Sequence, residues 1–328
     1  YKMMFLFNFT YMRKYLISLI NKNKFIESIV KNIYYSIQNF FQAFVQGMQV
    51  FFARKTNLIR RQDFPGFYLG RGIFTNRYLG ERKMTSLTVL AINQTFPFLN
   101  DLVESVSDKN KVYSVDEFAS LFTEIDVKVV DELKGKFNEY GSDKAGIHNY
   151  YLIYSCILHD TNSIRSLMEI GLGTNNTDVV SNMGANGKPG ASLRAFRDFL
   201  PNANIYGADI DKRVLFTEDR ITTFFVDQTQ PETFEQLNNH IPNDFDVIID
   251  DGLHSPNANI ATLTFALSKL KDGGWCIIED IIEDAIEIWH VIASIMPKDT
   301  YKCYIVKTKT AHLFLCQKSF NEALLDKK

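Results

Sequence analysis

The chain has 328 residues, 46% of them hydrophobic, and a formal net charge of -2. This composition supports a proper hydrophobic core, in one large domain or two smaller ones. No 18-residue run is apolar enough for a convincing membrane span. The four cysteines form neither a C-x-x-C pair nor a disulfide-like framework, a pattern typical of reduced core residues in a cytoplasmic protein.

Positive charge is concentrated at the start of the chain. Residues 1–83 hold 14 Lys and Arg against 3 Asp and Glu, a balance of +11, and the remainder carries -13. The basic part suggests contact with an anionic surface, and the acidic remainder suggests a cation site. A tail that folds back on its own acidic body explains the basic part equally well. The acidic body opposes binding to nucleic-acid phosphates, so no nucleic-acid partner is expected.

Residues 11–55 are predicted to be helical. From Asn32 to Ala53 there is no charge, and polar residues recur every three or four positions between aromatic ones. This stripe favours packing on the protein's own core or a homo-oligomer contact over a peripheral helix in the membrane plane. Residues 56–83 are expected to be an irregular arm. Because the chain begins with Tyr1, Met84 is a candidate alternative start.

Residues 84–160 are predicted to be a mostly helical auxiliary or lid region, distinct from the basic extension of residues 1–83. Its clearest helices are Val115–Phe122 and Val127–Lys136. The stretch Phe137–Lys144 suits either a lid over a site or a polar turn that leads into a helix over Asn149–Leu158. Polar turns are common, so these residues taken alone favour the turn.

From Ser166 onward, apolar strand-like runs alternate with helical segments. This alternation predicts βαβ units, and therefore an α/β domain over residues 161–328 with a Rossmann-like parallel sheet covered on both faces. A final pair of runs predicts a hairpin that adds an antiparallel strand. The runs are Leu167–Ile170, Ile205–Ala208, Thr222–Val226, Phe245–Ile249, Trp275–Ile278, Tyr301–Lys307 and Ala311–Cys316, and the helices are Ser192–Leu200, Pro231–Asn239 and Ser255–Leu270.

Acidic residues follow two neighbouring strands of this predicted sheet. The segment Asp250–His254 follows Phe245–Ile249, and Glu279-Asp280 follows Trp275–Ile278. The carboxyl ends of parallel strands open into one crevice, so three or four carboxylates and an imidazole are expected to lie together. Carboxylates that close repel one another unless a cation or protons lie between them. The pair of clusters therefore predicts a cation site, although strand-end acids that cap helices or face water would explain either cluster alone.

The first three strands end in a second group of chemical signals. Glu169 is followed by Gly171 and Gly173, and such glycines let the backbone turn sharply and approach a ligand closely. The second strand ends at Asp209, whose carboxylate can accept hydrogen bonds from ribose hydroxyls. The third ends at Asp227, near the expected place of an adenine. Each acid alone suits a solvated loop, but the series predicts an adenosine-containing ligand.

Together these residues carry a family resemblance. Glu169, Gly171, Gly173 and Asp209 resemble the S-adenosylmethionine site of class I methyltransferases. The motifs Asp250-Asp251-Gly252-x-His254 and Gly273-Gly274-x-x-x-Ile278-Glu279-Asp280 resemble metal-dependent O-methyltransferases that modify macrolide sugars, of the mycinamicin and macrocin type. Tyr140-Gly141-Ser142-Asp143-Lys144 also fits that group, which favours a place for this stretch beside the site. The resemblance covers about residues 137–318.

The resemblance implies a role for each matching residue. Asp251, Glu279 and Asp280 would bind Mg²⁺, and His254 would be the general base. The methyl donor S-adenosylmethionine would be held by residues at the first four strand ends, namely Glu169, Gly171, Gly173, Asp209, Asp227 and Asp250. Leu253 stands where a serine is usual in the family, which puts the detailed substrate contacts in doubt.

We therefore predict an enzyme that transfers a methyl group from S-adenosylmethionine to a hydroxyl of a sugar or glycosylated small molecule, with Mg²⁺. Oxygen ligands suit Mg²⁺, a cation beside a hydroxyl lowers its pKa, and an imidazole accepts protons near neutral pH. One alternative is a catechol-type O-methyltransferase, which would have a lysine base in the region where this chain has His254. Another is a non-catalytic adenosine-binding scaffold tethered by the basic arm.

Overall fold

The computed structural model describes residues 95–106, 110–122 and 125–319. The chain divides into two compact units, residues 1–91 and residues 92–328, and all described residues belong to the second. The predictions for residues 1–83, including the polar stripe from Asn32 to Ala53, lie outside the described residues. In the described part of the chain, no helix is long and apolar enough to span a membrane.

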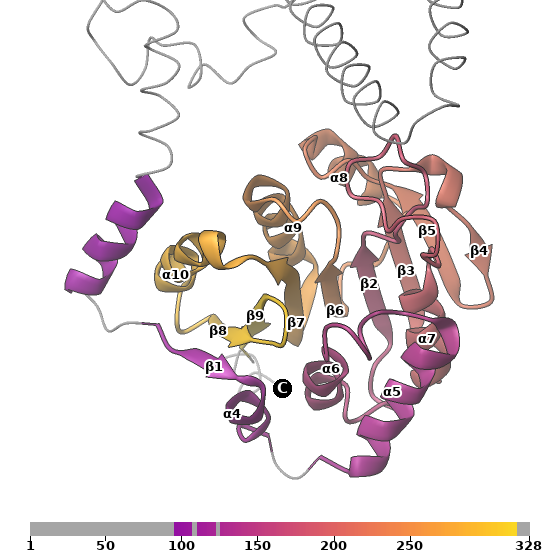
Figure 1. The fold of residues 1–328 in the computed structure, drawn as a ribbon, viewed down its shortest axis with the longest axis horizontal. Helices are drawn as coiled ribbons and strands as arrows, with labels where there is room; N and C mark the ends of the chain where they lie inside the picture. Colours follow the sequence, from indigo (N-terminus) through magenta and orange to yellow (C-terminus); the bar gives the residue numbers. More distant parts are fainter. Residues whose placement is uncertain (1–94, 107–109, 123–124, 320–328) are drawn as a thin grey trace, which may run out of the picture. The chain divides into compact units, whose positions relative to one another are not determined.

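A sheet of nine strands, counted over the described residues, forms the centre of this unit (Figure 1). The strands are β1 (Val112–Ser114), β2 (Ser166–Ile170), β3 (Asn204–Asp209), β4 (Thr217–Glu218), β5 (Ile221–Phe225), β6 (Phe245–Asp250), β7 (Leu270–Ile281), β8 (Tyr301–Lys307) and β9 (His312–Lys318). Their order is β1-β8-β9-β7-β6-β2-β3-β5-β4. The middle run, β7-β6-β2-β3-β5, is parallel throughout.

Hydrophobic burial explains why these runs form the middle of the sheet. Every residue of β2 and β6 is buried, as expected for parallel strands with both faces covered. The strands β8 and β9 pair antiparallel, and β9 also pairs antiparallel with β7, so the predicted terminal hairpin is confirmed. The predicted α/β fold with a mostly parallel sheet is confirmed as well, whereas the short edge strands β1 and β4 had not been predicted.

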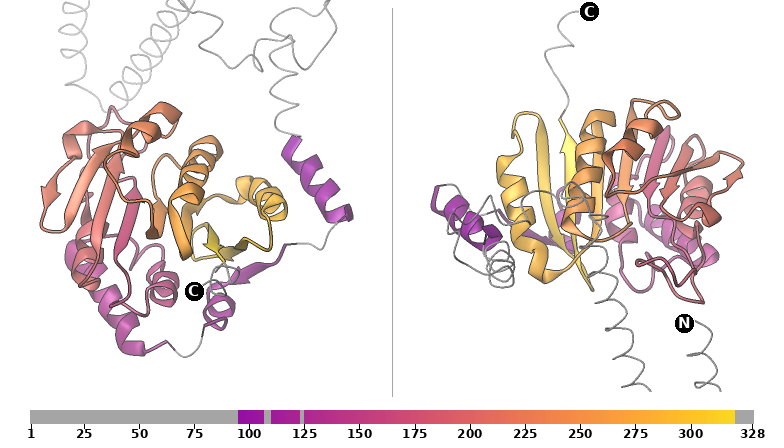
Figure 2. Two further views of the ribbon diagram at one scale, coloured as in Figure 1. Left: turned by 180° about the vertical axis from the view of Figure 1, so that it is seen from behind. Right: turned by 90° about the horizontal axis from the view of Figure 1, so that it is seen from above.

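Different helices cover the two faces of the sheet (Figures 1 and 2). One core layer includes α5, α6 and α7, and the other includes α8, α9 and α10. Within residues 110–319, the α-helices are α4 (Val115–Ala119), α5 (Val127–Tyr140), α6 (Tyr151–Ile157), α7 (Ala191–Phe199), α8 (Pro231–Leu237), α9 (Pro256–Lys269) and α10 (Ile286–Ile295). Helix α10 had not been predicted from the sequence.

The end of α5 directs the chain toward the functional site. The helix continues to Tyr140, four residues beyond the predicted Lys136. Gly141 then adopts a left-handed conformation, with φ of 76°, and the amide of Ser142 donates to the carbonyl of Phe137. This pairing closes a helix terminus in the usual way for glycine. The chain therefore turns sharply at Gly141, and Lys144 contacts acids at the carboxyl ends of the strands before α6 begins.

Candidate active site

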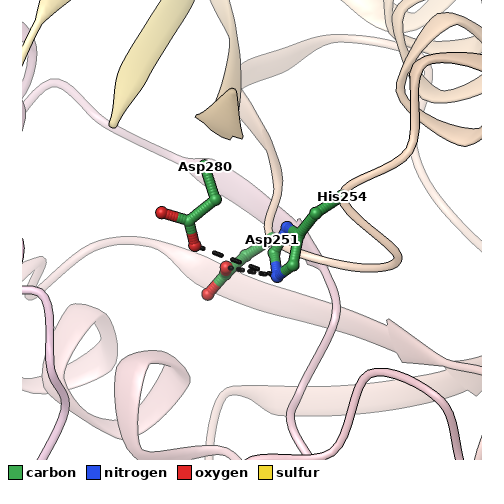
Figure 3. Close-up of side chains that lie close together, drawn as sticks. All are labelled: Asp251, His254 and Asp280. Atoms are coloured by element: carbon green, nitrogen blue, oxygen red, sulfur yellow. Dashed lines mark ion pairs between the residues drawn. The ribbon is translucent and has the colours of Figure 1, made fainter. Parts of the chain in front are cut away.

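Asp251, His254 and Asp280 converge beyond the carboxyl ends of β6 and β7 (Figure 3). One ligand atom from each lies within 4.8 Å of the other two. Nε2 of His254 is 4.0 Å from an oxygen of Asp251 and 3.8 Å from an oxygen of Asp280. Asp250 is level with Ile278 in the parallel pair, so the residues after them meet at one edge of the sheet. The structure thus brings together three of the four residues predicted for metal binding and catalysis.

The backbone at this cluster is strained. His254 and Asp280 have φ of 54° and 55°, in the left-handed region that non-glycine residues rarely adopt. Each such residue costs about 1–2 kcal/mol. The two strained residues lie close together, so the surrounding fold must hold their side chains in place at a cost in stability. Strain of this kind is common at functional sites.

Glu279, the fourth predicted residue, does not belong to this group of close ligand atoms, but it shares the partner Lys144 with Asp251. It is almost fully buried, and its two oxygens accept hydrogen bonds from the Lys144 ammonium and the Tyr154 hydroxyl. Burial raises the pKa of Glu279 well above its ordinary value, although Lys144 opposes the rise. Each carboxylate oxygen has two lone pairs, so these contacts leave part of its acceptor capacity unused.

Lys144 is the functional residue that sequence reasoning left without a role. Its side chain is 2% exposed, and Nζ lies 2.7 Å from Asp251 and 3.2 Å from Glu169, with Glu279 as its third partner. Burial alone would lower the pKa of Lys144, but attraction to the three carboxylates raises it well above the ordinary value. The ammonium therefore stays charged; it donates hydrogen bonds to Asp251 and Glu279, and it forms an ion pair with Glu169. The only sequence signal for it was its place in the Tyr140–Lys144 stretch.

Asp280 is supported by residues from the turn that precedes α6. Its Oδ1 accepts a hydrogen bond of 2.5 Å from the hydroxyl of Tyr150, a side chain that is almost fully buried. The ring of His148 stacks beside Tyr150, and its Nδ1 lies 2.7 Å from Oγ1 of Thr310 and 3.6 Å from Asp280. His148 and Tyr150, which precede α6, therefore both lie against Asp280.

A cavity of about 540 Å³ lies at the carboxyl ends of β2, β3, β5 and β6. Gly171, Gly173, Asp209 and Asp227 line it, as predicted for residues around an adenosine-containing ligand. Gly171 has φ of 100°, and a Cβ there would lie 2.0 Å from the carbonyl oxygen of Asp251. Only glycine allows the β2 turn to approach the Asp251 loop this closely.

The acids around this cavity already accept hydrogen bonds from the protein. The two oxygens of Asp209 take the backbone amides of Leu172 and Asp211, each at 2.8 Å, and burial raises the pKa of Asp209. Asp227 accepts from Thr229 and Gln230. These bonds fix the orientation of both carboxylates at the cavity wall.

Two residues predicted to hold the donor do not line this cavity. Asp250 is fully buried and accepts from the side chains of Gln228 and Asn259 at 2.8 and 3.1 Å, so it supports the Asp251 loop from behind. Glu169 is also fully buried, and it faces Lys144 and the hydroxyl of Ser192. In this arrangement, the carboxylate of Asp250 therefore does not face the space in which a donor would bind.

A second cavity of about 430 Å³ adjoins the first. Lys144, Asp251, His254 and Asp280 all line it. The two cavities share a wall of residues, namely Gly171, Gly173, Ser181 and Asp251. Asp251 thus stands between the cavity at the ends of β2, β3, β5 and β6 and the cavity beside His254 and Asp280.

No family model matches the chain, but curated proteins do. The 8-demethyl-8-alpha-L-rhamnosyl tetracenomycin-C 2'-O-methyltransferase of Streptomyces olivaceus is 28% identical over 162 residues, which are 49% of this chain and 40% of that protein. The mycinamicin VI 2''-O-methyltransferase of Micromonospora griseorubida is 38% identical over 93 residues, 28% of this chain and 23% of that protein. The chain therefore spans less than half the length of these relatives.

A structural comparison finds the MycE methyltransferase from the mycinamycin biosynthetic pathway, solved in complex with Mg, SAH and mycinamycin VI. It is 20% identical, covers 58% of this chain and 54% of its own, and gives a TM-score of 0.48. The resemblance predicted from the motifs is confirmed by the curated relatives. This chain is thus similar to O-methyltransferases over part of its length, 49% for the rhamnosyl tetracenomycin-C enzyme and 28% for the mycinamicin VI enzyme.

Proposed function

We propose that this chain transfers a methyl group from S-adenosylmethionine to a hydroxyl group of a sugar or a glycosylated small molecule, with the help of Mg²⁺. One observation carries the proposal: Asp251 lines both adjoining cavities and also belongs to the cluster with His254 and Asp280. A donor in one cavity and an acceptor in the other would meet beside this residue. The sugar O-methyltransferases to which the chain is similar support this class of acceptor.

The first cavity fits the donor. About 540 Å³ is within the usual size range of small-molecule sites. Asp209 and Asp227 are fixed at the wall where ribose and adenine would lie, and the glycine at position 171 lets the β2 turn approach the Asp251 loop at the same wall. When bound there, S-adenosylmethionine supplies a methyl group on a positively charged sulfur. Gly171 and Gly173 would hold its methionine end near the second cavity.

The acid cluster fits Mg²⁺. Its carboxylates are hard oxygen ligands, and two of them, Asp251 and Asp280, already lie close together. Glu279 is proposed as the third ligand, through the lone pairs that Lys144 and Tyr154 leave free. A divalent cation at this place would lower the pKa of a neighbouring acceptor hydroxyl and orient it.

His254 is the proposed general base. Its Nε2 faces Asp251 and Asp280 across 4.0 and 3.8 Å, so a hydroxyl held by these acids would lie within reach of the imidazole. The other basic group of the cluster, Lys144, stays protonated because its three carboxylate partners hold its pKa far above neutral. This difference argues against a catechol-type enzyme that relies on a lysine base. His254 would accept the proton while the methyl carbon passes to the acceptor oxygen, with positioning supplying much of the rate.

The test is a methyl-transfer assay with the full chain, S-adenosylmethionine, Mg²⁺ and a panel of glycosides and catechols. We expect turnover with a glycoside and its loss on treatment with a chelator. His254→Ala should lower kcat by at least 100-fold, the range for a general base, and Asp251→Ala should abolish turnover. Both variants should still bind S-adenosylhomocysteine in calorimetric titration.

A matched control is His240→Ala, which removes an exposed imidazole that lies outside both cavities. It should keep the activity of the unmodified chain. Full activity of Asp251→Ala or His254→Ala would refute the proposed site, and methyl transfer to catechols alone would refute the proposed acceptor.

A further inference from the structure

The longest irregular connection beside the donor cavity runs between β2 and α7. Residues 171–190 contain neither helix nor strand. Irregular connections of this length are uncommon in compact domains and are usually functional. The first residues, 171–173, form the glycine turn. That turn does not explain what the following ten residues, 174–183, do. We call residues 174–183 the strap.

The strap is fixed to two different strand ends by side-chain contacts. On the β3 side, the hydroxyl of Thr174 donates to Asp211 at 2.7 Å, and the guanidinium of Arg213 donates to both oxygens of Asp178 at 2.8 and 3.2 Å. On the β6 side, the hydroxyl of Ser181 donates to the carbonyl of Gly252 at 2.8 Å. The strap therefore crosses from one side of the donor cavity to the other.

The same residues form the outer wall of that cavity. Val179, Val180 and Ser181 line it together with Asp209 and Asp227 at the strand ends. The carboxylate of Asp178 and the guanidinium of Arg213 also line it, at the rim. A molecule in the cavity would lie between the strand ends and the strap, and would leave most directly by displacing the strap.

Two of the three apolar side chains of the strap, Val180 and Met183, are exposed. Val180 is 90% exposed, so it adds little burial that would fix the segment. Arg213, in contrast, is held firmly in place, because its guanidinium also donates to both oxygens of Asp211 at 2.6 and 3.0 Å. It thus presents a fixed, planar pair of donors to Asp178, and such bidentate pairs are stronger than single contacts.

We propose that Asp178 and Arg213 are positioning residues that hold the strap closed over the methyl donor and set the rate at which the donor and its product exchange. The inference rests on the proposed function for the identity of the ligand. The ion pair lies at the rim, with side chains that are 70% and 52% exposed, so it can open without disturbing the core.

This role has a kinetic signature that a binding contact does not have. If the ion pair holds the strap closed equally with and without ligand, breaking it favours the open form in both states. Entry and exit then accelerate by the same factor, and the dissociation constant stays unchanged. A residue that bound the ligand directly would instead weaken the affinity, mainly through faster dissociation.

The test is stopped-flow measurement of S-adenosylhomocysteine binding to the full chain and to Asp178→Asn. We expect the association and dissociation rate constants of the variant to rise together by about two- to fivefold, the factor that a surface ion pair contributes, with the Kd unchanged. Raising the ionic strength should accelerate exchange in the unmodified chain by screening the pair, and should have little effect on Asp178→Asn.

Two further variants serve as controls. Asp219→Asn removes an exposed acid that lies 3.9 Å from its arginine partner Arg220, outside both cavities, and should leave exchange unchanged. Asp178→Glu keeps the negative charge and should restore slow exchange and its salt dependence. Unchanged rates in Asp178→Asn, or a weaker Kd through dissociation alone, would overturn the strap proposal. Failure of the unmodified chain to bind S-adenosylhomocysteine would instead overturn the proposed function.

Discussion

A single buried ammonium joins the two halves of the candidate site. Lys144 contacts Glu169 at the end of β2 and Asp251 at the end of β6, while Glu279 at β7 completes its set of partners. Burying charges is costly, and a buried pair repays that cost only when every partner is satisfied. Removing one charged partner therefore destabilises the fold by more than the intact pair stabilises it, because the remaining charges stay buried without compensation.

Lys144→Met is accordingly expected to lower the unfolding free energy by about 3–5 kcal/mol near neutral pH, measured by urea denaturation in the presence of a chelator. Burial raises the pKa of Glu169 from its ordinary value of 4.5 to about 7, against the opposing effect of Lys144. A carboxyl pKa raised on folding contributes stability below pH 4.5 that is lost as the pH rises through 7. Loss of the ammonium deepens that change, so the variant should lose more stability at pH 8 than at pH 5.

Lys136→Met provides the comparison, since Lys136 pairs with Glu139 on the surface of α5. A pair of this kind is worth about 0.5 kcal/mol or less. An equally small effect of Lys144→Met, or a loss that does not grow with pH, would contradict the central role given to this ammonium.

Individual residues of the site differed in how far the sequence could predict them. Asp251, His254 and Asp280 could be placed together because each follows a parallel strand, and such strands end at one crevice. Lys144 could not be paired with Asp251, because 107 positions separate them and the lysine comes from a turn with no strand to fix its direction. The burial of Asp250 could not be predicted for a related reason, since its hydrogen-bond partners Gln228 and Asn259 come from other loops and helices.

At the scale of elements, the central strands and most of the helices were predictable, whereas the edge strands β1 and β4, helix α10 and the course of the connections were not. The runs at β2 and β6 are apolar throughout because both faces are covered, so composition alone identified them. The short edge strand β4 has two residues and too little burial to leave a pattern. For the β2–α7 connection the sequence predicted only the glycine turn. The path of the strap is set by side-chain contacts with distant loops.

The glycine turn itself gives a sharp test of this connection. Gly171 and Gly184 both have positive φ, of 100° and 71°, but their surroundings differ. A Cβ at Gly171 would lie 2.0 Å from the Asp251 carbonyl oxygen, whereas at Gly184 it would meet nothing within 4 Å. Gly184→Ala should therefore cost only the left-handed backbone conformation, about 1–2 kcal/mol. Gly171→Ala must also move the Asp251 loop, and should lose more stability together with most of the affinity for S-adenosylhomocysteine.

Thermal unfolding and calorimetric titration of the two variants check this difference. Equal effects would show that the close approach of the β2 turn to the Asp251 loop is not needed. Retained affinity in a well-folded Gly171→Ala protein would contradict the placement of the donor cavity against this turn.

At the scale of the whole molecule, the described site draws on one unit of the chain. Both cavities, the cluster of Asp251, His254 and Asp280, and every strand of the sheet lie in the unit of residues 92–328. Residues from 112 to 157, predicted as part of a separate auxiliary region, supply β1 to the sheet and α5 and α6 to its core layer. The site is therefore built into the body of this unit.

A shortened chain that begins at Met84 should consequently retain the donor site. Compact units with their own core can fold alone, and the contacts that shape the cavities come from residues 141–280. We expect cooperative unfolding and a Kd for S-adenosylhomocysteine within about threefold of the full chain, a change below 1 kcal/mol, by calorimetry. Asp251→Ala in the shortened chain should again spare donor binding. A shortened chain that folds but binds the donor more than about tenfold more weakly would show that residues 1–83 contribute directly to the site.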